Sequence, residues 1–120
     1  MSNAVITKEI VTGYTNAWVS KDLDAAKAFL AEDLSFNGSL ETHCSAASFL
    51  AGFAQFLPMV TGMNELEAVW EDGKAFLLYD LETAGPAGTM RCAEILTVDG
   101  SKITDIKLVF DASAFRAAQA

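Results

Sequence analysis

The hydrophobic pattern changes its period near Asn64, and this change most constrains what the chain can fold into. Before this point apolar residues recur every three or four positions, as in amphipathic helices. After it they alternate, and Asp72-Gly73 and Asp99-Gly100 are hairpin turn signals between strand-like runs. This order predicts an α+β fold, with three N-terminal helices packed on one face of a strongly curved antiparallel sheet. A curved sheet wrapped around a long helix would enclose a pocket.

The first helix is expected to present one continuous apolar face to the sheet. The residues that carry this face recur every fourth position: Ile6, Ile10, Tyr14 and Trp18. After a break at Ser20-Lys21, Asp22 can cap a second, shorter helix that ends at residues 31–33. Its apolar stripe is expected to comprise Leu23, Ala26, Phe29 and Leu30.

A short strand over residues 34–37 and a loop over 37–44 are expected to separate the second and third helices. Ser45 can cap the third helix, and Pro58 closes it after Leu57. This helix carries an aromatic stripe that fits the core, a ligand pocket or a subunit contact: Phe49, Leu50, Phe53, Phe56 and Leu57.

Two hairpins complete the prediction. The expected strands are 65–71 with 74–83, and 89–98 with 101–110. A two-residue turn at Asp72-Gly73 would place Leu66 opposite Tyr79. The same turn type at Asp99-Gly100 would place Glu94 opposite Asp105, where two carboxyls could share a proton, whereas a bulge would separate them. A last helical turn is expected around residues 115–116.

Charge and composition narrow the class of protein. Sixteen acidic against eight basic residues give a net charge of −8, which disfavours nucleic acid and anionic membrane surfaces as partners. A length of 120 residues with 52% hydrophobic content fits one domain spanning 1–120. Because no secretory signal or membrane-spanning run is found, a cytoplasmic protein is expected. Cys44 and Cys92 are then expected to stay reduced, as small buried hydrophobes.

The chain resembles the SnoaL-like branch of the nuclear transport factor 2-like superfamily, which includes polyketide cyclases and ketosteroid isomerases. The residues that carry the resemblance are Tyr14, Trp18, Lys21 to Ala26, Phe29 to Phe36, Val98 to Ile103 and Leu108 to Asp111. It implies a cone-shaped, cystatin-like fold around a pocket for a small apolar molecule. It also implies a homodimer formed through the outer sheet face, where Val69, Phe76 and Leu78 would form an apolar patch.

In ketosteroid isomerases a helix tyrosine and a strand carboxylic acid donate hydrogen bonds to a developing enolate oxygen. The resemblance places Tyr14 and Glu94 in these roles, while Asn37 and Gly38 stand where that family has its aspartate base. Glu41 and His43 are nearby replacement candidates, and we select His43 because its ordinary pKa near 6.5 suits proton transfer. A solvated loop histidine is the alternative.

The remaining candidates are pocket residues: Trp18, Phe36, Phe53, Tyr79 and Phe110. Metal-ligand spacings and nucleotide-binding glycine motifs are missing from the sequence, so no metal and no cofactor are expected. The sequence therefore predicts a cofactor-independent isomerase, cyclase or dehydratase that acts on a small apolar carbonyl compound. The alternative is a non-catalytic ligand-binding or dimerisation module of the same fold.

Overall fold

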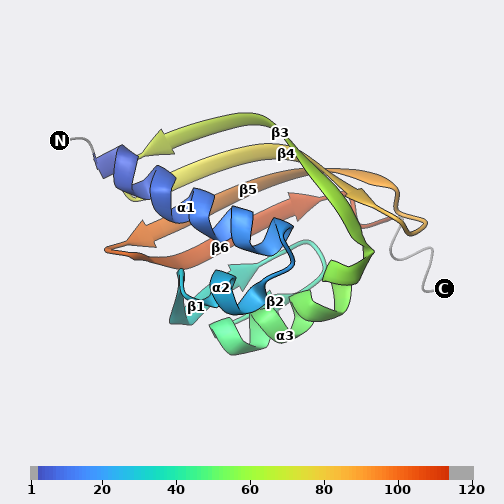
Figure 1. Ribbon diagram of the computed structural model, residues 1–120, viewed down its shortest axis with the longest axis horizontal. Helices are drawn as coiled ribbons and strands as arrows, with labels where there is room; N and C mark the ends of the chain where they lie inside the picture. Colours follow the sequence, from blue (N-terminus) through green and yellow to red (C-terminus); the bar gives the residue numbers. More distant parts are fainter. Residues whose placement is uncertain (1–2, 114–120) are drawn as a thin grey trace.

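Helices cover one face of a curved, six-stranded sheet in the computed structural model, which describes residues 3–113 (Figure 1). The helices are α1 (Asn3–Val19), α2 (Leu23–Lys27) and α3 (Ala46–Phe56), and the short 3-10 helix η1 (Leu57–Met59) follows α3. The strands are β1 (Leu30–Asn37), β2 (Thr42–His43), β3 (Val60–Glu71), β4 (Lys74–Thr83), β5 (Thr89–Asp99) and β6 (Lys102–Phe110). The expected α+β class is confirmed, and the expected turn at residues 115–116 lies outside the described residues.

The sheet is mixed rather than wholly antiparallel. Its strand order is β2-β1-β6-β5-β4-β3, and β1 runs parallel to β6 while the other neighbours are antiparallel. The expectation that Leu30 and residues 31–33 belong to the second helix was wrong. The backbone N–H of Ile103 donates to the carbonyl of Phe29 over 2.7 Å, and Leu30 pairs with Ile103, so strand pairing with β6 already begins there.

The buried face of α1 differs from the expected one by about one residue. Thr7, Val11, Tyr14 and Trp18 are buried, whereas Ile6 is 41% exposed. The hydroxyl of Thr7 accepts a hydrogen bond of 2.9 Å from the backbone N–H of Gly73. This contact fixes the helix rotation through a residue that is distant in sequence.

Local signals placed the starts of the second and third helices correctly, whereas the end of the second helix was misplaced. Asp22 caps α2 by accepting from the backbone N–H of Ala25 over 3.0 Å, and Ser45 caps α3 in the same way with Ser48 over 3.1 Å. Lys21, at the predicted break, has a positive φ of 64°. The caps and the break were therefore predicted correctly.

Two bulges shift the strand registers that were expected. In the first hairpin Leu66 is unpaired, so Glu65 rather than Leu66 lies opposite Tyr79. In the second hairpin Gly100 and Ser101 form the turn and Thr104 is unpaired. As a result Glu94 lies opposite Leu108, and the hypothesis of a carboxyl pair with Asp105 was wrong.

Other boundaries also differ from the expectation. Strand β3 begins at Val60 rather than at residue 65, and the short strand β2 lies within the expected loop. Cys44 is exposed because it lies between β2 and α3, so only Cys92 is the small buried residue expected of both cysteines.

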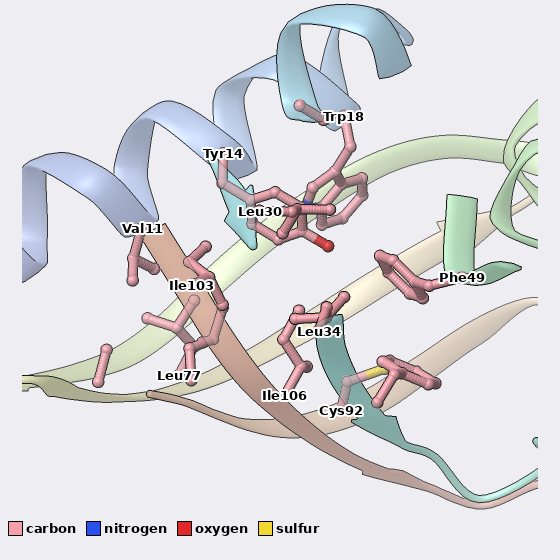
Figure 2. Packing of buried hydrophobic residues seen from close by; sticks show 14 of the residues in the cluster. Val11, Tyr14, Trp18, Leu30, Leu34, Phe49, Leu77, Cys92, Ile103 and Ile106 are labelled. Carbon is pink, nitrogen blue, oxygen red and sulfur yellow. The ribbon is translucent and has the colours of Figure 1, made fainter. Parts of the chain in front are cut away.

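The core lies between α1 and the inner face of the sheet. Figure 2 shows Val11, Tyr14 and Trp18 projecting from α1 toward side chains of the strands. Leu34, Leu77, Leu96, Ile103 and Ile106 are among the fully buried residues beneath them. Within residues 3–113, none of the helices has the length and apolar character needed to cross a membrane.

Candidate functional site

A cavity of about 150 Å³ lies between helices α1 and α3 and the inner face of the sheet. Its wall is mostly aromatic and aliphatic, and Leu40, which is 44% exposed, is the part of the wall that meets solvent most openly. The residues that line the cavity are Tyr14, Trp18, Phe36, Leu40, Phe49, Phe53, Phe56, Tyr79, Leu81, Met90, Cys92, Glu94, Leu108 and Phe110.

The structure brings most of the predicted site residues together around this cavity. Those that line it are Tyr14 and Trp18 from α1, Phe36 from β1, Phe53 from α3, Tyr79 from β4, Glu94 from β5 and Phe110 from β6. They meet because α1 crosses the inner face of the sheet, where alternate residues of each strand point toward it. Figure 2 shows Tyr14, Trp18, Phe49 and Cys92 facing this shared interior.

Glu94 is the acidic group of the cavity wall. It is only 4% exposed and lies between Leu77 of β4 and Leu108 of β6. Its Oε1 atom has no hydrogen-bond partner in the part of the chain that the structure describes. Burial without a counter-charge disfavours the carboxylate and raises the pKa of Glu94 from 4.5 to about 7. Below that pH the group is a neutral acid that can donate a hydrogen bond.

Two phenols flank Glu94. Burial, and secondarily the negative charge that Glu94 can carry, raises the pKa of both Tyr14 and Tyr79 well above 10. Both hydroxyls therefore keep their protons at neutral pH and can donate hydrogen bonds. Cys92 lies opposite Tyr79 on the neighbouring strand, and its Sγ atom lies 3.7 Å from the backbone carbonyl of Met90. Burial, followed by the nearby Glu94, raises the pKa of the Cys92 thiol to about 12, so it is not a thiolate nucleophile.

His43 is not among the residues that line the cavity. Its Nδ1 atom lies 2.6 Å from the Ser48 hydroxyl, and its Nε2 atom lies 3.3 Å from Glu41 Oε1. Its ring packs 6.0 Å from Phe36 and 6.2 Å from Phe49, both of which line the cavity. His43 therefore connects β2 to α3 behind the aromatic wall.

The cavity wall holds no carboxylate other than Glu94 among the described residues. Asn37, at the position where the resemblance expects the base, is exposed at the end of β1. The described residues hold no cluster of three or more His, Cys, Asp or Glu side chains that could bind a metal ion. The chemistry of the wall is therefore that of one acid and two phenols in apolar surroundings.

Several lining residues were not predicted from the sequence. Met90 and Cys92 share the inner face of β5 with Glu94, and the alternation along this strand is a signal that could have found them. Leu40 carries no such signal, because it lies in the irregular segment between β1 and β2.

Solved structures with the same fold support the class of protein that this architecture defines, which is the nuclear transport factor 2-like fold. A protein from Kribbella flavida DSM 17836 matches with a TM-score of 0.86 and 29% identity over 92% of this chain and 91% of its own. A candidate ketosteroid isomerase from the same organism gives a TM-score of 0.80 and 16% identity over 92% and 81% of the two chains. A candidate SnoaL-like polyketide cyclase from Shewanella denitrificans OS-217 matches with a TM-score of 0.76 and 13% identity, over 92% of this chain and 93% of its own.

The sequence itself defines the family more narrowly. Residues 11–106 match the SnoaL-like domain, and the chain belongs to this family. No curated protein sequence matches the chain.

Proposed function

We propose that the cavity binds a small hydrophobic molecule through an oxygen acceptor, and that the protein is a cofactor-independent isomerase, cyclase or dehydratase. The observation that carries this proposal is Glu94, a buried carboxyl with an unpartnered oxygen on the cavity wall. An unpaired buried polar group is costly, so a ligand that supplies its hydrogen bond is favoured. The named ketosteroid isomerase and polyketide cyclase neighbours fit a carbonyl ligand.

Tyr14 and Glu94 would act on the ligand as hydrogen-bond donors. Both are protonated at slightly acidic pH, and both lie in apolar surroundings, where a hydrogen bond to a developing oxyanion is stronger than in water. His43 would serve as a proton carrier only indirectly, because Phe36 and Phe49 rather than His43 form the cavity wall.

A non-catalytic binding module is the second candidate, and one observation favours it. The described part of the cavity wall has no second carboxylate or imidazole that could accept a proton while Glu94 donates one. The pocket would then bind an acceptor ligand without turning it over.

Both candidate functions require the cavity to bind an oxygen acceptor at Glu94, and the pH dependence of ligand binding tests this requirement. Acetophenone is a suitable probe because its ketone accepts hydrogen bonds and does not donate them. With a pKa of about 7, the protonated fraction of Glu94 falls about tenfold between pH 6 and pH 8, so binding should weaken by about the same factor. Nuclear magnetic resonance titration at both pH values measures this change.

Two variants assign the titration to a residue. Glu94→Gln should remove the pH dependence, since the amide keeps a donor but does not titrate. His43→Gln should leave it unchanged, because His43 is outside the wall. Loss of the pH dependence in His43→Gln, and its persistence in Glu94→Gln, would overturn the assignment.

We also propose a homodimer formed through the outer face of the sheet. Two neighbouring rows of paired residues on β3 to β6 carry apolar side chains there, which we call the outer patch: Val69, Phe76 and Ile95 in one row, Leu78, Ala93 and Val109 in the other. Charged residues border the patch, because Lys107 continues the first row and Glu67 the second. Val69 is 53% and Val109 65% exposed. A second copy of the chain would cover this apolar area.

A further inference from the structure

The aromatic rings on the cavity wall limit the size of the ligand. Phe36 and Phe49 stack with centroids 4.6 Å apart, Phe49 and Phe53 are 5.6 Å apart, and Phe53 and Trp18 are 5.5 Å apart. Trp18 in turn lies 6.4 Å from Tyr79. These contacts join α1, α3, β1 and β4 into one connected wall. A ligand larger than the enclosed space would have to break such ring contacts or extend past the exposed Leu40.

The volume of the cavity corresponds to one ring. A dry apolar cavity of about 150 Å³ holds benzene, whereas pockets for drug-sized ligands measure about 300–1,000 Å³. The cavity has about 150 Å³. A four-ring steroid or a fused polyketide exceeds this enclosed space, so its remaining rings would have to project past the exposed Leu40 into solvent.

The polar groups are confined to one part of the wall. Glu94 Oε1 is unpartnered there, and Tyr14 and Tyr79 are close enough for the charge of Glu94 to affect their pKa values. Elsewhere the lining is apolar, and a second polar substituent buried against it would lose its hydrogen bonds to water. Near Leu40, which is 44% exposed, such a substituent could reach solvent.

We propose that the natural ligand is a single-ring carbonyl compound or phenol, with its oxygen at Glu94 and Tyr14 and its ring against Phe53 and Trp18. This inference rests on the proposed function and adds the ligand class to it. A ligand of this class is smaller than steroids and other multi-ring substrates.

A series of ketones that differ only in size tests the proposal: acetophenone, 1-tetralone and a four-ring 3-ketosteroid. Binding is followed by the indole N–H signals of the two tryptophans in nuclear magnetic resonance spectra. Trp18 lines the cavity and Trp70 does not, so Trp70 is an internal reference. Acetophenone should shift the Trp18 signal and leave Trp70 in place. The ketosteroid should shift neither signal up to its solubility limit.

Phe53→Ala should relax the size limit, because it removes one ring from the wall and leaves Glu94 and Tyr14 in place. The affinity for 1-tetralone relative to acetophenone should rise at least tenfold in this variant. Phe76→Ala is the matched control, since Phe76 lies on the outer patch, and the ratio should stay within twofold. If Phe53→Ala does not fold, Phe53→Leu should change the ratio in the same direction by a smaller factor.

The outcomes separate this proposal from the one on which it rests. A ketosteroid that shifts the Trp18 signal at the concentration of acetophenone or below would overturn the size limit while leaving the pocket assignment intact. An unchanged ratio in a folded Phe53 variant would also overturn it. If no ketone shifts Trp18, the proposed function itself fails.

Discussion

Replacing Glu94 by glutamine should stabilise the protein, and the gain should grow with pH. The pKa of Glu94 is 4.5 in an ordinary environment and about 7 in the folded chain, so the folded state binds the proton more tightly than the unfolded state. Stability therefore falls as the pH rises from about 4.5 to about 7 and changes no further above that window. At about 1.36 kcal/mol per pKa unit, ionised Glu94 lowers the free energy of unfolding by about 3 kcal/mol. Glutamine cannot ionise and avoids this loss.

Urea unfolding followed by circular dichroism, at several pH values from 4 to 8, measures the difference between the two proteins. Glu94→Gln and the native chain should be nearly equal near pH 4, and the variant should be more stable by about 3 kcal/mol near pH 8. Glu67→Gln is the control, since Glu67 is exposed on β3 and its removal should give a small difference that does not follow this curve. A difference for Glu94→Gln that is constant across the pH range would refute the argument that burial controls this carboxyl.

Two further predictions concern the thiols and the outer patch. Native protein should react quickly with one equivalent of a disulfide reagent at the exposed Cys44, and with a second at Cys92 only after unfolding, because the buried Cys92 thiol has a pKa of about 12. Two fast equivalents in the native state would contradict this. Phe76→Lys and Val109→Lys should each shift the mass measured by light scattering from the dimer toward the 12.8 kDa monomer, because a charge would be buried at the interface. A native chain that is already monomeric at high concentration would rule out the dimer.

Features set by neighbouring residues were predicted well from the sequence. The caps at Asp22 and Ser45 need only the following turn of helix, and the first hairpin needs only Asp72-Gly73. Features set by distant contacts were not. The rotation of α1 depends on the hydrogen bond from Gly73 to Thr7, across 66 residues of sequence. The pairing of β1 with β6 is another long-range contact without a local signal.

The site was predicted where the alternation of a strand or the spacing of a helix determines the direction of a side chain. Tyr14 and Trp18 on α1 and Tyr79 on β4 reach the cavity on this basis. The position of the His43 side chain outside the cavity depends on non-local contacts. Its ring packs against Phe36 and Phe49 behind the wall, and no spacing rule predicts that packing.

A single extra residue in β6 determines which side chain lies opposite Glu94. With the turn at Gly100-Ser101 and no bulge, regular antiparallel pairing would place Lys107 directly opposite Glu94, where it could pair with an ionised carboxyl, and would turn Ile106 and Leu108 to the outer face. Because Thr104 is unpaired, the register moves by one residue, so that Leu108 lies opposite Glu94 and Lys107 binds Asp105 over 2.6 Å. Glu94 therefore lies opposite an apolar side chain rather than a cation, and its burial raises its pKa. A neutral acid in an apolar cavity selects a ligand that accepts a hydrogen bond, whereas the salt-bridged carboxylate of the regular register would have no proton to offer.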